Sequence, residues 1–320
     1  MSEFPILSIC IPTYNRAEYL KKTLESIVVQ KKFSSNEVEI VISDNASSDD
    51  TGDVAKLYCK KYSNIRYYRN KENVRDCNYP LVISKATGMY RKLCNDTMEF
   101  NEGALELLLS TINNHIKEKP VIFWNSGNED IKKDTLFCTL NEAIEKISYW
   151  ATSISCFGIW EEDFVYNEEG CSKSLWQVPN LFGAIEKKDK IYVCTKEFYS
   201  IQGVKNKDLS YGLYEVFYKN FLGYILEQCK KGTVTEKVFH KVKKDLLFKF
   251  FLGWVVAKRN NSSAKYSETE QFEELLVESY RNESYYKYYR LKVNYCCFVL
   301  MLKKKTKLVI NKVRNLWNKK

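Results

Sequence analysis

Residues 6–16, Ile-Leu-Ser-Ile-Cys-Ile-Pro-Thr-Tyr-Asn-Arg, decide the fold class of this chain. The first six form a short, mostly apolar run, which is typical of a buried β-strand. Pro12 ends this run, and the polar residues Thr13–Arg16 lead into Ala17–Gln30, where apolar side chains recur at helical spacing. The stretch therefore predicts a strand, a polar loop and a helix in immediate succession.

The same order of elements repeats through the first 126 residues. Strands alternating with helices predict a largely parallel sheet covered by helices on both faces, an α/β fold. In such sheets, ligands bind beyond the carboxyl ends of the strands. The further strands are expected at Val38–Ser43, Ile65–Arg69, Met89–Cys94 and Val121–Trp124, and the further helices from about Asp49 to Tyr62, at Asn78–Ala86 and at Gly103–Ile116.

Polar clusters follow three of these strands, at Thr13–Arg16, Asp44–Asp50 and Asn95–Thr97. Because the carboxyl ends of parallel strands share one edge, we expect the clusters to converge there. Each cluster taken alone is also compatible with a capped turn. The glycine-rich fingerprints of dinucleotide-binding folds and of P-loops are absent from the sequence.

Taken in order, these pieces resemble family 2 glycosyltransferases, which have the nucleotide-sugar-binding GT-A fold. The resemblance covers residues 6–126 well and the remainder loosely. It implies a mostly parallel sheet flanked by helices, followed by a helical C-terminal extension. It is carried by SICIPTYNR (8–16), EIVISDNASSDDT (39–51), NVRDCNY (73–79) and KATGMYRKLCNDT (85–97).

The resemblance also implies roles for individual residues. Asp96 would be the metal-binding acid, with Mn²⁺ or Mg²⁺ as the divalent cation. The family usually carries an Asp-x-Asp element here, whereas this chain has Met98 in the third position. The nucleoside pocket would be formed by Pro12, Thr13, Asn15, Arg16, Asp44, Asp76, Asn78 and Asn95.

The catalytic base is expected in the second half of the catalytic domain, where the sequence shows an acidic run, Glu161–Asp163. Asp163 is the first candidate for the base and Glu162 the second. An exposed acidic run of this kind is also typical of solvated surface.

The activity that the resemblance implies is transfer of a hexosyl or N-acetylhexosaminyl group by an inverting single displacement. The donor would be a nucleotide-diphosphate sugar, with a UDP-sugar favoured, and the acceptor a saccharide, lipid-linked, in bacterial capsule or O-antigen synthesis. The incomplete acidic element leaves an alternative open, a catalytically inactive module that binds a nucleotide or a glycan.

The net charge of +10 is confined to the C-terminus. Residues 287–320 carry eleven Lys and Arg and no Asp or Glu, so the other 286 residues hold 39 basic and 40 acidic side chains. This distribution argues against a nucleic-acid-binding groove. In Lys303–Lys320 the residues Leu302, Val309, Val313, Leu316 and Trp317 recur at helical spacing among lysines, which predicts an amphipathic membrane-surface helix.

The remaining composition predicts a protein of a reducing compartment. The eleven cysteines include no CxxC pair, and the N-terminus lacks the pattern of a signal peptide. We therefore expect a cytoplasmic protein associated peripherally with the inner face of the cell membrane. The expected domains are a catalytic domain at 1–222 (nucleotide half 1–126, acceptor half 127–222), a helical extension at 223–286 and a basic tail at 287–320.

Overall fold

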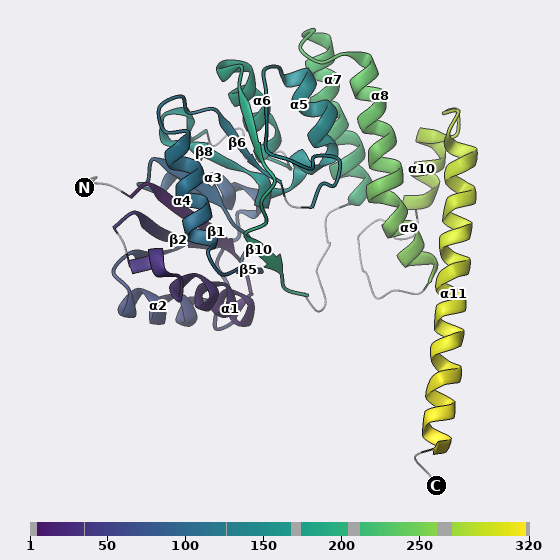
Figure 1. The fold of residues 1–320 in the computed structure, drawn as a ribbon, viewed down its shortest axis with the longest axis horizontal. Helices are drawn as coiled ribbons and strands as arrows, with labels where there is room; N and C mark the ends of the chain where they lie inside the picture. Colours follow the sequence, from purple (N-terminus) through teal and green to yellow (C-terminus); the bar gives the residue numbers. More distant parts are fainter. Residues whose placement is uncertain are drawn as a thin grey trace. The chain divides into compact units, whose positions relative to one another are not determined.

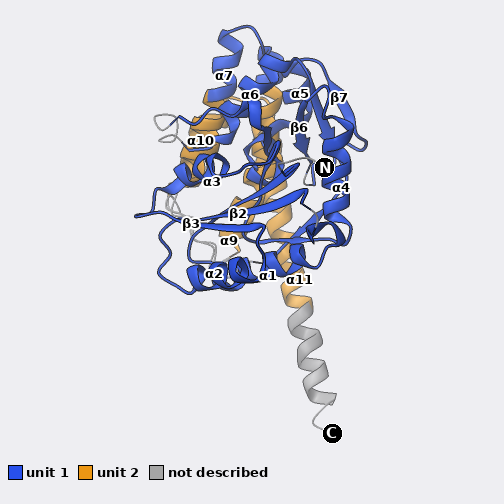
Figure 2. Cartoon of the chain, turned by 90° about the vertical axis from the view of Figure 1, so that its left-hand side faces the viewer, with its two compact units in different colours: residues 1–204, 224–239 blue, residues 205–223, 240–320 orange. Residues whose placement is uncertain are grey.

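The computed structural model describes residues 5–34, 36–125, 127–167, 174–203, 212–260 and 271–317, with the side chains of the last helix described as far as 306. The chain divides into two compact units (Figure 2). Unit 1 comprises residues 1–204 and 224–239, and unit 2 comprises residues 205–223 and 240–320. The finer domain boundaries expected from the sequence stay a prediction.

A five-stranded sheet of order β3-β2-β1-β4-β8 forms the centre of unit 1 (Figure 1). Its first four members are parallel and β8 pairs antiparallel with β4, so the predicted α/β fold class is confirmed. All residues of β1 and β2 are buried, as expected for parallel strands covered on both faces. The strands are β1 (Leu7–Thr13), β2 (Val38–Asp44), β3 (Ile65–Arg69), β4 (Tyr90–Leu93) and β8 (Gly158–Trp160).

Strand β1 runs two residues further than the sequence predicts, through Pro12 to Thr13. Its ladder with β4 ends at the pair Cys10–Leu93. Pro12 lacks an N–H group, and it lies beyond this ladder, where no hydrogen bond to β4 is needed.

Helices cover both faces of this sheet. In Figure 2, α1 and α2 lie on one side of it and α3 on the other. Leu20 and Leu24 of α1 and Leu105 of α4 pack into one apolar core with Ile9 and Ile11 of β1. The helices are α1 (Ala17–Val28), α2 (Thr51–Lys61), α3 (Asn78–Ser84) and α4 (Ala104–Asn114).

The predicted strand Val121–Trp124 exists as β6, but it belongs to a second sheet of order β6-β9-β7. Here β9 (Ile191–Cys194) runs parallel to β6, and β7 (Thr135–Phe137) runs antiparallel to β9. A two-stranded antiparallel sheet joins β5 (Met98–Phe100) to β10 (Tyr199–Ile201). Further elements of this region are α5 (Leu140–Ile147), α6 (Gln177–Lys188) and short 3₁₀ turns at Ser148–Thr152, Ile154–Cys156 and Glu161–Asp163. Two more 3₁₀ turns, Lys31–Ser34 and Arg75–Cys77, lie in the first half of unit 1.

The described chain beyond residue 212 is helical, as the resemblance implies. Within unit 2, Phe251 and Phe272 pack edge to face with ring centroids 5.4 Å apart, and the buried Tyr280 hydroxyl donates to the Lys243 carbonyl at 3.0 Å. The elements are a π-helical segment Tyr214–Phe221, α7 (Leu222–Lys230), α8 (Glu236–Asp245), a second π-helical segment Leu246–Phe251, α9 (Leu252–Arg259), α10 (Phe272–Tyr280) and α11 (Tyr286–Trp317).

Among the described residues, no helix has both the length and the hydropathy needed to cross a membrane.

Gly158 of β8 is required by close packing against Tyr90. A Cβ atom at position 158 would lie 2.3 Å from the Tyr90 hydroxyl oxygen. The ring is held in place because this hydroxyl donates to the Ile122 carbonyl at 3.1 Å and accepts from Trp124 Nε1 at 3.0 Å. Gly158→Ala should therefore lower the free energy of unfolding by about 1–3 kcal/mol.

Thermal unfolding checks this expectation against Gly183→Ala in α6. A Cβ atom added at position 183 would meet no other atom within 4 Å, so alanine there should be neutral or slightly stabilising. Equal melting temperatures for the Gly158→Ala variant and the parent would show that Tyr90 has room to move.

Candidate functional site

The carboxyl ends of the parallel strands bring the predicted polar clusters to one edge of the sheet. The last pair between β1 and β2 joins Thr13 to Asp44, and the last pair between β2 and β3 joins Asp44 to Arg69. The Thr13 hydroxyl donates to Asp96 Oδ2 at 2.8 Å, which links the end of β1 to the loop after β4. The predicted convergence of the three clusters is therefore observed.

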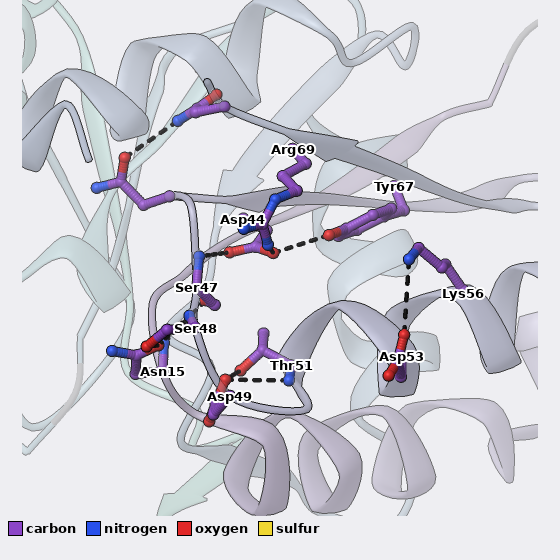
Figure 3. Close-up of polar contacts among 12 residues, drawn as sticks. Asn15, Asp44, Ser47, Ser48, Asp49, Thr51, Asp53, Lys56, Tyr67 and Arg69 are labelled. Atoms are coloured by element: carbon purple, nitrogen blue, oxygen red, sulfur yellow. Dashed lines mark hydrogen bonds and ion pairs between the residues drawn. The ribbon is translucent and has the colours of Figure 1, made fainter. Parts of the chain in front are cut away.

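The loop after β1 is bonded to the loop after β2 (Figure 3). Asn15 adopts a left-handed backbone conformation with φ of 51°, which asparagine tolerates better than most residues. Its N–H donates to Ser47 Oγ at 2.9 Å, and its side-chain carbonyl accepts the Ser48 N–H at 2.8 Å. Asn15, a predicted nucleotide-site residue, thus holds the two loops together.

A second set of contacts joins the start of α1 to the start of α2. Asp49 Oδ1 accepts the Thr51 N–H at 3.0 Å and the Thr51 hydroxyl, and Asp49 Oδ2 accepts the Ala17 N–H at 3.2 Å. The Arg16 N–H donates to the Thr51 hydroxyl at 2.9 Å. Hydrogen bonds lower the pKa of Asp49 against the opposing effect of its partial burial. Both helix N-termini are therefore fixed at this edge.

Asp44 is fully buried and its carboxylate is satisfied by the protein (Figure 3). Oδ1 accepts the Ser47 N–H at 2.8 Å, and Oδ2 accepts the Tyr67 hydroxyl at 2.7 Å and Arg69 Nη1 at 3.0 Å. Burial, together with the bond to Asp44, raises the pKa of Tyr67 to about 12. The contact to Ser47 is the turn contact expected from the capped-turn alternative. No sequence motif indicated that Tyr67 and Arg69 would bind Asp44.

Asn78 and Asp76 lie beyond the third strand and differ in how they are bonded. The Asn78 amide is buried, accepts the Ser43 hydroxyl at 2.6 Å and donates to the Ser43 carbonyl at 2.9 Å. Asp76 is half-buried, burial raises its pKa, and its Oδ2 accepts the Leu175 N–H at 3.4 Å. Asn78 is thus a fixed part of the scaffold, whereas Asp76 retains hydrogen-bonding capacity for a ligand.

Asp96 is a partly exposed residue at this edge. Burial of its carboxyl group raises the pKa to about 6, although the Thr13 hydrogen bond and the charge of Arg16 act in the opposite direction. Within the described part of the chain, no basic side chain forms an ion pair with this carboxylate within 4.0 Å. Asp96 therefore offers a negative charge that the protein only partly compensates.

Residues distant in sequence support the Asp96 loop. The Thr23 hydroxyl of α1 donates to the Asp96 carbonyl at 2.9 Å. Gln202, which follows β10, donates its N–H to the Thr97 carbonyl at 2.9 Å and its amide to the Thr23 hydroxyl at 3.3 Å. No motif in the sequence marks Thr23 or Gln202, because their role arises only from the return of the chain to this loop.

The donor set around Asp96 fits a divalent cation that takes its other ligands from substrate. Met98 is fully buried, and its sulfur accepts the Asn95 N–H at 3.2 Å, so it is turned away from the edge into the protein. Among the described residues, no three His, Cys, Asp or Glu side chains are grouped so as to hold a metal. Mg²⁺-like ions are commonly held by one or two carboxylates plus phosphates and water, and Asp96 can supply one such ligand.

The acidic run Glu161–Asp163 does not reach this edge. Because β8 is antiparallel to β4, Gly158 lies opposite Lys92 while Trp160 lies opposite Tyr90, nearer the amino end of β4. The Glu161 N–H then donates to the Met89 carbonyl at 2.8 Å. The run is therefore at the amino edge of the sheet, away from Thr13, Asp44 and Asp96.

Lysines neutralise the two carboxylates that the sequence singled out as catalytic bases. Asp163 accepts from Lys188 Nζ at 2.9 Å and from Lys187 Nζ at 3.3 Å, and its side chain is 4% exposed. Glu162 pairs with Lys119 and with Lys188, and the hydrogen bonds from these lysines lower its pKa. Neither carboxylate lies with the other predicted site residues, and the assignment of the catalytic base stays a prediction.

The comparisons with known proteins agree with this architecture. Residues 8–150 match the model of a family described as "Glycosyl transferase family 2". The match supports the resemblance that the sequence motifs indicate. The match contains the loops after β1, β2, β3 and β4 and therefore every nucleotide-site and metal-site residue predicted from the sequence.

Two relatives illustrate the range of this chain's similarity to known proteins. It is 45% identical over 87 residues to the abequosyltransferase RfbV of Salmonella typhimurium, covering 27% of this chain and 26% of the relative. It is 26% identical over 234 residues to the GalNAc(5)-diNAcBac-PP-undecaprenol beta-1,3-glucosyltransferase of Campylobacter jejuni, covering 69% and 72%. The match to the first relative thus spans about a quarter of that protein's length.

Solved structures show the GT-A fold. S. aureus TarS 1–349 in complex with UDP-GlcNAc is 18% identical with a TM-score of 0.55, over 85% of this chain and 80% of that one. The mannosyltransferase PcManGT from Pyrobaculum calidifontis, in complex with GDP-Man and Mn²⁺, is 12% identical with a TM-score of 0.57, over 100% and 89%. The GT-A fold expected from the sequence is therefore confirmed.

Proposed function

We propose that this chain is a family 2 glycosyltransferase that transfers a sugar from a nucleotide-diphosphate sugar to a saccharide acceptor. The observation that carries the proposal is Asp96, a carboxylate with raised pKa and incomplete charge compensation, placed at the carboxyl edge of a GT-A sheet. A carboxylate with a purely structural role would form an ion pair with a basic side chain, as Asp44 and Asp163 do. Such a charge is suited to a cation that arrives with the donor.

In this proposal each residue at the carboxyl edge of the sheet binds a different part of the donor or positions a residue that does. Asp96 would hold Mn²⁺ or Mg²⁺, which when bound stabilises negative charge on the diphosphate leaving group. Thr13 keeps the Asp96 carboxylate oriented through its 2.8 Å hydrogen bond. Arg16 and the N-terminus of α1 provide positive charge for the phosphates. Asp76 has capacity to accept from a base imide or a ribose hydroxyl.

The other predicted nucleotide-site residues contribute mainly through the shape of the pocket. Asn15, Asp44 and Asn78 are bonded within the protein, so their side chains set the positions of the loops rather than present free groups. Pro12 and Asn95 lie at the ends of β1 and of the strand that leads to Asp96. The inactive binding module is less favoured, because the relatives described above are named as sugar-transferring enzymes.

The finer assignments rest on the relatives. The Campylobacter relative is named for glucosyl transfer to an undecaprenol-diphosphate-linked saccharide, which supports a lipid-linked acceptor and a place in bacterial surface polysaccharide synthesis. The TarS complex with UDP-GlcNAc supports a UDP-sugar and transfer of a hexosyl or N-acetylhexosaminyl group. We further propose an inverting single displacement at the inner face of the cell membrane, with the C-terminal tail as the membrane contact.

Binding of the donor tests the proposal first. The melting temperature should rise with UDP-GlcNAc, UDP-glucose or GDP-mannose and rise further with Mn²⁺ at pH 8, since ligand at 100 times its Kd adds about 2.7 kcal/mol of stability. The protein with Mn²⁺ alone and with the free sugars serves as the control.

Turnover of the stabilising donor with a saccharide acceptor then separates an enzyme from a binding module. The anomeric configuration of the product, read by NMR, reports inversion or retention. Absence of stabilisation by every nucleotide sugar, with and without Mn²⁺, would refute the proposed function.

A further inference from the structure

Helix α11 (Tyr286–Trp317) is a single continuous helix (Figure 1). Its first half carries apolar side chains on two different faces. One face is packed within unit 2, where Tyr286, Tyr289 and Val293 are at most 9% exposed and α9 lies against the helix. Of the other apolar side chains in its first half, most are exposed, whereas Cys296, Cys297 and Val299 are half-buried. The packed face determines how the helix is oriented in unit 2.

Five of the exposed apolar side chains form a continuous stripe, which we call the α11 stripe, and the exposed Leu300 and Met301 lie outside it. Its members recur at steps of three and four residues and are between 45% and 67% exposed. At about 100° per residue, the stripe is centred roughly opposite the packed face. At its N-terminal end, Tyr288 stacks on Phe248 of unit 2 with ring centroids 5.8 Å apart. The stripe consists of Tyr288, Leu291, Tyr295, Phe298 and Leu302.

Lysines border the α11 stripe along both sides. At about 100° per residue, Lys287 and Lys305 lie on one border and Lys292 and Lys303 on the other. Long lysine side chains at the borders of an apolar stripe can reach polar headgroups while the stripe enters the acyl boundary. Two tyrosines in the stripe have the amphipathic character of interfacial side chains.

We propose that the α11 stripe seats this helix flat on an anionic lipid surface. The inference rests on the proposed function, since a lipid-linked acceptor would lie at such a surface. It assigns the lipid contact to residues 287–305, which precede most of the amphipathic pattern that the sequence analysis identified in the C-terminal tail. Val309, Val313, Leu316 and Trp317 of that pattern lie outside the residues whose side chains are described.

A second copy of the chain is the alternative occupant, because steps of three and four also build coiled coils. Charge argues against this occupant. No Asp or Glu occurs from residue 287 to the end of the chain, so flanking lysines of paired helices would have no opposite charges to meet. Lys305 would also fall on the next position of the seam. An anionic membrane supplies the complementary charge that a second copy lacks.

Vesicle flotation of the full chain tests the inference. The protein should float with vesicles of phosphatidylcholine and phosphatidylglycerol at low salt and much less with phosphatidylcholine alone or at high salt. Leu291→Asn with Phe298→Asn should weaken binding at least tenfold. Lys287→Gln, Lys292→Gln and Lys303→Gln together should weaken it roughly a hundredfold at low salt. Four of these side chains are exposed, and Lys292 is half-buried with its Nζ 5.6 Å from the Phe248 ring centroid, so the fold should survive.

Matched controls lie on unit 1. Val29→Asn with Leu57→Asn removes exposed apolar surface elsewhere, and Lys22→Gln, Lys60→Gln and Lys237→Gln together remove the same charge. Both controls should float like the parent. Equal flotation of the stripe variant and the parent would overturn the inference. So would a parent that binds no lipid and forms a dimer in ultracentrifugation, if the stripe variant is monomeric.

Donor affinity measured by calorimetry without vesicles keeps the two proposals apart. All variants should bind the donor as the parent does, because no stripe residue is near the sheet edge in sequence or belongs to unit 1. A parent that binds donor but not vesicles contradicts the lipid contact only. A parent that binds vesicles but no nucleotide sugar contradicts the proposed function only.

Discussion

Replacing Asp96 with asparagine is expected to reduce sugar transfer at least about a hundredfold, which corresponds to about 3 kcal/mol of barrier. Asparagine keeps the shape of the side chain and can still accept the Thr13 hydrogen bond, but it carries no charge to hold a cation. The loss should appear in kcat/KM at saturating Mn²⁺. Near-parent turnover of this variant would remove Asp96 from the metal site.

The same substitution should stabilise the protein in the absence of donor and metal. Burial raises the pKa of Asp96 from an ordinary 3.8 to about 6, so the folded state binds this proton more tightly than the unfolded chain does. The stabilisation from this proton is complete below about pH 4 and is lost as the pH rises through about 6. At pH 8 the ionised Asp96 carboxylate destabilises the fold by up to about 3 kcal/mol, and solvent screening of this partly exposed group reduces that value.

Urea unfolding at two pH values measures this effect. The advantage of Asp96→Asn over the parent should be largest at pH 8 and about a third as large at pH 4.5. Mn²⁺ with a nucleoside diphosphate should reverse the order at pH 8 by stabilising the parent alone. Thr13→Val is a useful companion, because loss of its hydrogen bond should raise the pKa of Asp96 further, whereas Thr13→Ser should not. A variant advantage that is independent of pH would contradict the assigned titration.

Replacing Asp44 with alanine is expected to weaken nucleotide binding at least tenfold and to lower the free energy of unfolding by about 2–4 kcal/mol. The substitution leaves the Ser47 N–H and the Tyr67 hydroxyl without their acceptor and frees the loop after β2. That loop is bonded to Asn15 in the loop after β1, so both sides of the edge should loosen.

Calorimetric titration with UDP, together with urea unfolding, separates the two effects of Asp44→Ala. Arg69→Gln is the matched control, because the Asp44 carboxylate keeps its hydrogen bonds from the Ser47 N–H and the Tyr67 hydroxyl, and the glutamine side chain can still donate to it. It should alter stability by no more than about 1 kcal/mol. Unchanged UDP affinity in a destabilised Asp44→Ala protein would restrict Asp44 to a turn role.

Local periodicity predicted the elements around the site with small errors. Strands at residues 38–44, 65–69 and 90–93 occur where alternation of strands and helices placed them. The convergence of Thr13, Asp44 and Asp96 was also predictable, since it needs only parallel strands with polar residues after their carboxyl ends. The sheet to which strand Val121–Trp124 belongs was not predictable, because an isolated apolar run does not indicate which sheet it joins.

The sequence by itself determined the α/β class, the order of the motifs and the edge at which Asp96 lies, because these depend on short-range patterns and on the rule for parallel sheets. Only the tertiary structure decided that Glu162 and Asp163 lie at the opposite edge, since strand direction depends on long-range pairing of β8 with β4. It also decided which polar residues use their hydrogen-bonding groups within the protein, as Asn78 and Asp44 do. The exposed side of α11 likewise became visible only once Tyr289 and Val293 were seen to be packed within unit 2.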